Sequence, residues 1–269
     1  MGSLGREFEK LLFQRRTYVG WAGLLAVPLL IVLALQLSNS KPGPGEGPPF
    51  FAAITNNGLF VPLAAIGALS FFLFPLVASM AGAYPLAGEA ETGTMKTWMS
   101  RPLSRATVLF SKWGVAILYV LVGMALVGLG GLLAGWLVFG AHPLVTLSGT
   151  TISIPVGLWH IVLANGLILG ALLCLISLAL FVSTLTNSSL TAAITTMVVY
   201  IVLNILNGFH YFDFMKPYTF TSYSLAFTNF FRDPIYWHPI RDALLTYGVT
   251  VAVLLVASWL VFRRKDILT

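Results

Sequence analysis

Long runs of apolar residues alternate with short polar segments along this chain of 269 residues. Asp, Glu, Lys and Arg are absent from four runs, which cover residues 17–40, 47–88, 113–212 and 243–262. An ionised side chain at the centre of a bilayer costs about 2.5 to 3.5 kcal/mol on insertion scales. A membrane environment is the simplest explanation of these runs, so the pattern predicts an all-α, polytopic membrane protein.

A membrane-spanning helix needs about 20 apolar residues, and clusters of Pro, Gly and Asn divide the runs accordingly. Six spans are predicted, over about residues 18–37, 59–84, 113–139, 156–185, 190–206 and 243–262. Pro75 is expected to kink the second span. In residues 1–16 apolar side chains recur at helical spacing, which predicts a short helix lying in the inner membrane interface; they are Leu4, Phe8, Leu11 and Leu12.

The distribution of Lys and Arg predicts the orientation, because cytoplasmic loops carry an excess of both. With the N-terminus inside, the outer segments hold only Lys41, Lys216, Arg232 and Arg241. The inner segments hold Arg6, Lys10, Arg15, Arg16, Lys96, Arg101, Arg105, Lys112, Arg263, Arg264 and Lys265. Both termini are therefore expected in the cytoplasm, and the protein is expected in the cell membrane.

Composition supports the membrane class and narrows the partners. Only 9% of residues are charged and 58% are hydrophobic, whereas soluble domains contain about 25% charged residues. The net charge of +6 reflects the excess of Lys and Arg in the predicted cytoplasmic segments, so it gives no support to nucleic-acid binding. Residues 1–269 are expected to form a single membrane domain.

The most polar segment, residues 85–111, lies between the second and third predicted spans and ends just before Lys112. It must lie in water, so it is predicted to be a cytoplasmic loop. A helix from Pro85 to about Met99 would place Glu89 and Lys96 on one face, about two turns apart, where a partner protein could bind them. The alternative is that the basic residues of this loop only anchor it at the inner surface.

Sequence motifs for several kinds of catalytic site are absent. The chain has no G-x-x-x-x-G-K-[ST], no H-E-x-x-H and no G-x-S-x-G, and its four His residues are scattered. It is not expected to be an enzyme or to hold a metal or cofactor. The predicted spans carry neutral polar groups, which are expected to bond between helices, in place of the carboxylates of ion-coupled carriers; they are Asn165, Ser177, Thr184, Asn204 and Asn207. Energy for transport would then come from another subunit.

The polar loop resembles that of ABC-2 type transporter permeases. Residues 88–94, GEAETGT, and residues 100–105, SRPLSR, are similar to the family's E-x-x-x-G-T and rP-x-x-R elements, and Lys112 matches the lysine that opens its third span. Residues 262–266, FRRKD, are similar to its F-x-R-[RK]-D close. The resemblance covers nearly the full length and indicates the branch without a fused ATPase, which includes permeases for nitrous-oxide-reductase maturation and for drug or bacteriocin immunity.

This resemblance implies a permease subunit that works with two copies of a P-loop ATPase, on which ATP and Mg²⁺ would bind. A second permease chain, identical or homologous, would complete the path among the membrane lipids. The resemblance implies that the ATPase is contacted through Glu89, Glu91, Thr92, Gly93, Thr94, Lys96, Arg101 and Arg105. Two glycine pairs permit close approach of helices, Gly131 with Gly135 and Gly166 with Gly170.

The segment between the fifth and sixth spans, residues 209–241, is rich in aromatic side chains. Aromatic residues at this density favour the membrane interface. The resemblance implies short re-entrant helices that close the outer mouth, and the gate candidates are Phe212, Phe214, Tyr218, Phe230 and Phe231. An aromatic belt without a gating role is the alternative.

Three functions remain open from the sequence. The first is the membrane subunit of an ATP-driven exporter, whose cargo is expected to be hydrophobic or amphipathic because the spans are neutral and apolar. The second is an ATPase-driven mechanotransmitting scaffold or assembly factor without substrate flux. The third is an intramembrane enzyme, which would need a polar catalytic group in a span, and no residue is placed like one.

Overall fold

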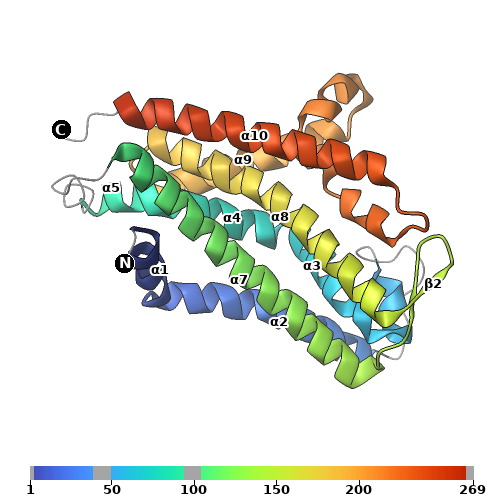
Figure 1. Ribbon diagram of the computed structural model, residues 1–269. Helices are drawn as coiled ribbons and strands as arrows, with labels where there is room; N and C mark the ends of the chain where they lie inside the picture. The colour runs from blue at the N-terminus through green and yellow to red at the C-terminus, as the bar shows by residue number, and fades with distance from the viewer. Residues whose placement is uncertain (1–2, 39–49, 94–103, 265–269) are drawn as a thin grey trace.

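The computed structural model describes residues 3–38, 50–93 and 104–264, which form an elongated bundle of helices (Figure 1). Five helices are long and apolar enough to cross a membrane: α2 (Arg15–Leu37), α7 (Arg105–Phe139), α8 (Ile154–Leu185), α9 (Ser189–Asn207) and α10 (Trp237–Arg264). A bent pair of shorter helices makes a sixth span when it is counted as one. The predicted all-α, polytopic fold is therefore confirmed.

The shorter elements lie at the two ends of the bundle or form the bent span. They are α1 (Ser3–Leu12), η1 (Phe51–Asn56), η2 (Gly58–Phe60), α3 (Val61–Phe71), α4 (Leu73–Ala83), η3 (Tyr84–Gly88), α5 (Glu89–Glu91), β1 (Leu144–Val145), β2 (Thr151–Ile152), η4 (His210–Tyr218), η5 (Phe220–Tyr223) and η6 (Ala226–Phe231). Strands β1 and β2 form an antiparallel hairpin in which Leu144 pairs with Ile152. The hairpin lies between the third and fourth predicted spans, where the sequence predicts no helix.

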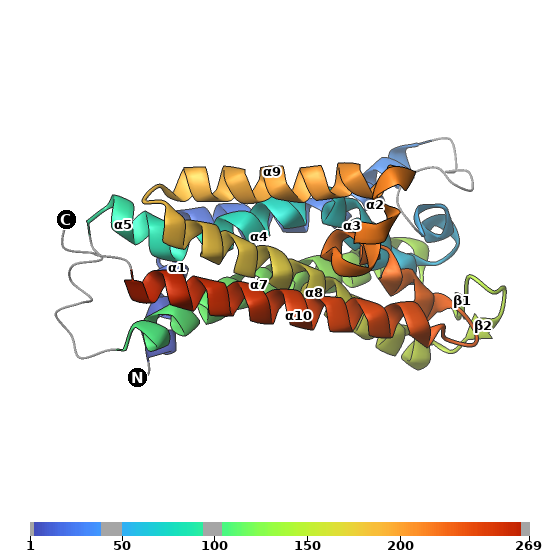
Figure 2. The ribbon, with the colours of Figure 1, turned by 90° about the horizontal axis from the view of Figure 1, so that it is seen from above.

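The elements predicted to be cytoplasmic share one end of the bundle. Helices α1 and α5, the start of α7 and the end of α10 lie together there, whereas the β1–β2 hairpin lies at the opposite end (Figure 2). We call these the α5 end and the hairpin end. The up-and-down order of the spans predicted from the sequence therefore agrees with the arrangement in space.

The second predicted span is broken at Phe72, where α3 and α4 meet at an angle of 62°. The predicted kink is present, three residues before Pro75: in a continuous helix Pro75 would have no N–H to donate to the carbonyl of Phe71, and its ring would clash with that carbonyl, so the helix breaks ahead of it. Phe72 itself has a φ of −140°, outside the helical range. After α4 the chain continues through η3, which is a π-helical turn.

Two other predicted boundaries also shift, and local capping explains one of them. Helix α7 begins at Arg105, ahead of the predicted start, because the Ser104 hydroxyl accepts a hydrogen bond from the backbone N–H of Thr107 at 3.1 Å. Helix α10 begins at Trp237, so the outer segment ends before residue 241.

Helix α8 is at the centre of the packing and contacts α4, α9 and α10, while α7 packs on α1, α2 and α3. On α7, Gly131 faces the backbone of Pro62 and Gly135 faces the backbone of Gly58. The backbone N–H of Gly58 also donates to the carbonyl of Gly140 at 3.0 Å. The predicted close approach at this glycine pair is confirmed, and it lies within one chain. Of the other pair, Gly170 packs under the ring of Tyr247, while Gly166 has open space.

Replacing Gly135 with alanine should destabilise the protein, because the added methyl group would collide with the Gly58 carbonyl. Overpacking of this kind costs about 1 to 3 kcal/mol. The control is Gly128→Ala on the same helix, where the methyl group meets no atom within 4 Å. We expect thermal unfolding in detergent to show a lower midpoint for Gly135→Ala only; equal midpoints would show that the contact is not tight.

Candidate functional site

Four charged side chains meet at the α5 end, and three of them are largely buried. The Nζ of Lys112 lies 2.6 Å from Oε2 of Glu89 and 3.6 Å from Oε2 of Glu7. The Nζ of Lys10 lies 3.1 Å from Oε1 of Glu7 and 3.6 Å from Oε1 of Glu89. Each lysine thus contacts both carboxylates, and we call these four residues the charge ring.

Because its side chains are largely buried, the charge ring needs both its positive and its negative charges. The exposed fraction of the side chain is 2% for Lys112, 7% for Glu7 and 15% for Glu89. Moving a charge out of water costs several kcal/mol unless an opposite charge compensates for it. The two glutamates and two lysines cancel each other, so the ring carries no net charge.

The charge ring joins three segments that are far apart in the sequence. Glu7 and Lys10 lie three residues apart on one face of α1, and α1 packs on α7, which carries Lys112. Glu89 starts α5, immediately after the π-helical turn η3. The ring therefore fixes the start of the polar loop on α1 and α7.

A second contact holds the end of α5 on α9. Oε2 of Glu91 accepts hydrogen bonds from the backbone N–H of Ser189 at 3.2 Å and from its hydroxyl at 2.9 Å. Ser189 is the first residue of α9, and a carboxylate is favourable at a helix N-terminus because of the exposed N–H groups and the helix dipole.

A third contact holds the start of α7 on α10. Nη1 of Arg105 donates to the carbonyls of Phe262 at 2.9 Å and Arg263 at 3.0 Å, which are among the last of α10. Cations are favourable at a helix C-terminus. We call the Glu91–Ser189 and Arg105–α10 contacts the loop clamps. They lie on either side of residues 94–103 in the chain.

The structure describes five of the eight residues that the sequence assigned to ATPase contact, and all five lie at the α5 end: Glu89, Glu91, Thr92, Gly93 and Arg105. The other three, Thr94, Lys96 and Arg101, lie outside the described residues. The predicted continuous helix from Pro85 to Met99 is wrong, because α5 ends at Glu91 and Gly93 has a φ of +70°. The Glu89 carboxylate faces the charge ring, and the sequence had placed it on an outward face.

Sequence reasoning missed Glu7, although a signal was present. Glu7 lies three residues after Leu4 and four before Leu11, so it falls on the apolar face of α1. An acidic residue on an apolar face requires a buried cation, and Lys112 is the cation nearest to the apolar run of the third span. Glu7 on an apolar face and Lys112 beside an apolar run could together have predicted the charge ring.

The outer segment consists of the short helices η4, η5 and η6, as predicted, and the Asn207 side chain at the end of α9 anchors it. Nδ2 of Asn207 donates to the Thr221 hydroxyl at 2.7 Å, and its Oδ1 accepts from the Ser222 hydroxyl at 3.0 Å. At the exposed tip of this segment the pKa of Asp213 is lowered. The main cause is a hydrogen bond from Lys216, and the second is a hydrogen bond from His210.

The five gate candidates do not come together. Phe230 and Phe231 are buried, and Phe231 stacks edge-on against Phe50 of the segment before η1. In contrast, Phe214 is 67% exposed and Tyr218 is 81% exposed, while Phe212 is half-buried. Only the first two belong to the core, and a gating role for the set stays a prediction.

The neutral polar groups of the spans mostly bond within their own helices, so the prediction of bonds between helices is wrong for three of them. Asn165, Thr184 and Asn204 donate to backbone carbonyls of the same helix. Ser177 does connect helices, because it accepts a hydrogen bond from Nε1 of Trp113 at 3.1 Å. Across the described ranges there is no group of three or more His, Cys, Asp or Glu that could hold a metal ion.

The comparisons with known proteins identify one family. A family model described as ABC-2 family transporter protein matches residues 6–267. A comparison with curated proteins finds no match. The matched range includes the whole charge ring, both loop clamps and the outer segment.

Proposed function

The chain belongs to the ABC-2 family of transporter proteins and is a multi-pass membrane component of a transporter, and we propose that a separate P-loop ATPase drives it from the α5 end. The observation that carries this proposal is the charge ring with its two loop clamps. Together they connect the described residues on either side of residues 94–103, Glu89, Glu91 and Arg105, to α1, α7, α9 and α10. A force applied at the loop would therefore reach four helices.

The ATPase would hold ATP and Mg²⁺, and this chain would convert its movement into a change among the spans. Displacement of α5 would act on α7 through Glu89 and Lys112, and on α9 through Glu91. Displacement of the start of α7 would act on α10 through Arg105. We propose export from the cytoplasm of a hydrophobic or amphipathic cargo, because the described spans are apolar and carry their charged residues near their ends.

A second permease chain would complete the transporter in this proposal. Large apolar side chains along α10 face away from the rest of the chain, among them Leu245, Val249, Val253 and Val256. Lipid or a second chain would cover this surface. Two permease chains with two ATPase subunits would then form the working assembly in the cell membrane.

The first test is a pull-down of the tagged chain from its native membrane in a mild detergent, with mass spectrometry of the bound proteins. We expect one P-loop ATPase for each permease chain. The matched control is an untagged membrane handled in the same way. If no ATPase is recovered in any of several detergents, the proposal is wrong and the polar loop only orients the chain in the membrane.

A further inference from the structure

The charge ring contains two sets of contacts of different length. In the close pairs, Lys112 lies 2.6 Å from Glu89 and Lys10 lies 3.1 Å from Glu7. In the distant pairs, Lys112 with Glu7 and Lys10 with Glu89, the charged atoms lie 3.6 Å apart. Each glutamate presents Oε1 to Lys10 and Oε2 to Lys112. The two lysines could therefore exchange partners through small movements, without any of the four charges leaving the ring.

Burial differs between the two lysines and determines which one can move. The Lys112 side chain is 2% exposed, so it cannot turn towards water and needs a carboxylate beside it at all times. The Lys10 side chain is 47% exposed and has a flexible stem, so it can follow a moving partner. Glu7, at 7% exposed, is the carboxylate that would remain beside Lys112 if Glu89 moved away.

Glu89 belongs to a run of helical turns that ends at the break in the second span. Helices α4 and α5 and the turn η3 between them follow one another without a gap from residue 73 to residue 91. At the other end of this run, three side chains at the break are exposed by 84%, 51% and 40%; they are Phe71, Phe72 and Leu73. This side of the break is not packed within the chain, so a change of its angle would disturb few contacts there.

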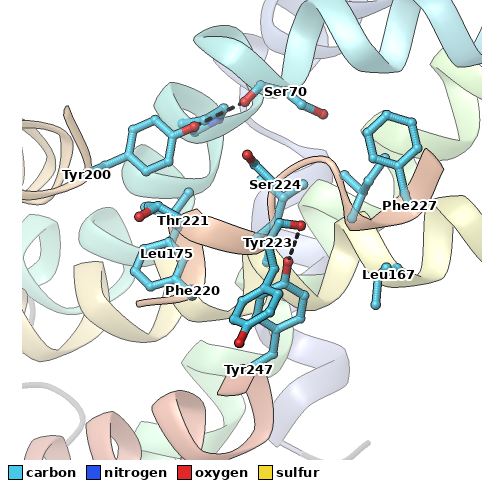
Figure 3. A pocket seen from close by; sticks show the side chains of 14 residues that line it. Ser70, Leu167, Leu175, Tyr200, Phe220, Thr221, Tyr223, Ser224, Phe227 and Tyr247 are labelled. Atoms are coloured by element: carbon cyan, nitrogen blue, oxygen red, sulfur yellow. Dashed lines mark hydrogen bonds between the residues drawn. The ribbon is translucent and has the colours of Figure 1, made fainter. Parts of the chain in front are cut away.

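Figure 3 shows the inner side of the same break. The Tyr200 hydroxyl of α9 points at the carbonyl of Ser70 and donates to it at 3.3 Å. Ser70 belongs to α3, so this bond holds the half of the span that leads to the hairpin end. A small cavity of about 30 Å³, lined by Ser70 and Pro75 among others, lies beside the break. The half that leads to Glu89 is on the other side of this fixed point.

The contacts of this half near the α5 end are made by small side chains. One buried cluster there joins α4 and η3 to α8 and α9 and consists of alanines alone; they are Ala83, Ala87, Ala179, Ala192 and Ala193. Packed helices move past one another by small sliding displacements. Alanines have no side-chain rotamers to rearrange, so sliding at this cluster needs no repacking.

We propose that the charge ring is a two-position switch in which Glu7 holds Lys112 when Glu89 moves from Lys112 to Lys10. In the first position, seen in this structure, Lys112 and Glu89 join α7 to α5. In the second position, the distant pairs become the close ones, so α1 is joined both to α5 and to α7. Every buried charge has an opposite charge beside it in both positions. The switch deepens the proposed function and rests on it only for the view that an ATPase drives the exchange.

Two double variants test the switch in the purified full chain in lipid nanodiscs. Both keep two positive and two negative charges in the ring. Glu7→Lys with Lys10→Glu leaves the close pairs attractive and makes both distant pairs repulsive, so it should hold the first position. Lys10→Glu with Glu89→Lys makes the close pairs repulsive and the distant pairs attractive, so it should hold the second position.

Pulsed electron paramagnetic resonance between spin labels would distinguish the positions. Labels are placed at three exposed residues, Gly5 on α1, Thr92 after α5 and Phe110 on α7, whereas the native Cys174 is buried. We expect the first double variant to give the wild-type distances. The second should shorten the distance between labels 5 and 92 and lengthen that between labels 92 and 110. Equal distances in the two double variants would overturn the proposal.

A single variant tests Glu7 as a positioning residue and decides the matter if a double variant does not fold. Glu7→Gln keeps the close pair of Lys112 with Glu89 and removes the carboxylate that waits for Lys112. In the complex with the copurified ATPase, it should abolish the change in the distance between labels 92 and 110 on addition of ATP and vanadate. Stimulation of ATP hydrolysis should fall by about tenfold.

The controls separate this role from a structural one. Glu9→Gln removes an exposed carboxylate from the same helix and should change neither the distance nor the stimulation. Glu7→Asp keeps the charge and should restore both in part. If Glu7→Gln lowers the midpoint of thermal unfolding but the distance still changes with nucleotide, Glu7 is only structural and the switch is wrong.

The two proposals can fail separately. If the double variants differ as expected but no ATPase is recovered with the chain, the switch stands and the proposed function is wrong. If an ATPase copurifies but the double variants give equal distances, the proposed function stands and the ring has a single position.

Discussion

Replacing Lys112 with methionine is expected to destabilise the α5 end severely, with a loss of about 3 to 5 kcal/mol in the free energy of unfolding. Methionine matches the length of the lysine stem, so the packing would be largely kept. The carboxylates of Glu7 and Glu89 would remain buried, and the half-exposed Lys10 would be the cation left to them in the charge ring. Chemical denaturation in detergent, together with size-exclusion chromatography, would measure the loss.

Two further variants separate a buried charge effect from a general effect of losing a lysine. Adding Glu89→Gln to Lys112→Met should recover part of the stability, because one buried negative charge is then removed. Lys216→Met breaks an exposed pair with Asp213, in which the two charged atoms lie 2.7 Å apart, and should cost much less, because water screens both charges. Similar losses for Lys112→Met and Lys216→Met would mean that the charge ring is as solvated as the surface pair.

Replacing Glu91 with lysine is expected to abolish ATPase association and stimulation while membrane insertion is unaffected. The variant removes the carboxylate that accepts two hydrogen bonds from Ser189 and places a cation at the N-terminus of α9, where positive charge is unfavourable. ATP hydrolysis by the reconstituted complex, measured with and without the variant chain, would test this. Unchanged coupling would remove Glu91 from the docking site.

Milder substitutions distinguish two ways in which Glu91 could act. Glu91→Gln keeps an oxygen that accepts from Ser189 but removes the charge, and Ser189→Ala removes only the side-chain donor. If Glu91 contacts the ATPase through its charge, Glu91→Gln should lose coupling and Ser189→Ala should keep it. If Glu91 acts by holding α9, the order should be reversed. Flux measured in the same vesicles would separate a transporter from a scaffold that hydrolyses ATP without moving cargo.

The membrane spans could be predicted because the absence of charge over about 20 residues is a property of the sequence itself. The bend of the second span could also be predicted, because Pro75 disrupts the helical turn before it. The direction of the bend could not, because the end of α3 is bonded by Tyr200, a residue of α9 that lies 130 positions along the chain. A bend held by such a distant contact is a property of the tertiary structure.

The loop motif likewise indicated which residues gather at the α5 end but not where they point. Glu89 and Glu91 are the same residue type and lie two positions apart. Glu89 is nevertheless held by the lysines of the charge ring, whereas Glu91 is held by the start of α9. The helix predicted from Pro85 to about Met99 required helical spacing to continue through the loop. Gly93, with its positive φ, ends that spacing within the described residues.

The length of α7 has a consequence for how movement could cross the membrane. Its 35 residues form one helix without proline or a break, and such a helix is about 52 Å long, whereas the hydrocarbon core is about 30 Å thick. The single helix α7 therefore connects the charge ring at the α5 end with the Gly58–Gly135 contact towards the hairpin end. The neighbouring second span, in contrast, is broken at Phe72 and bent by 62°. A push at the α5 end would be carried straight through by α7, whereas the second span could absorb the same push by bending.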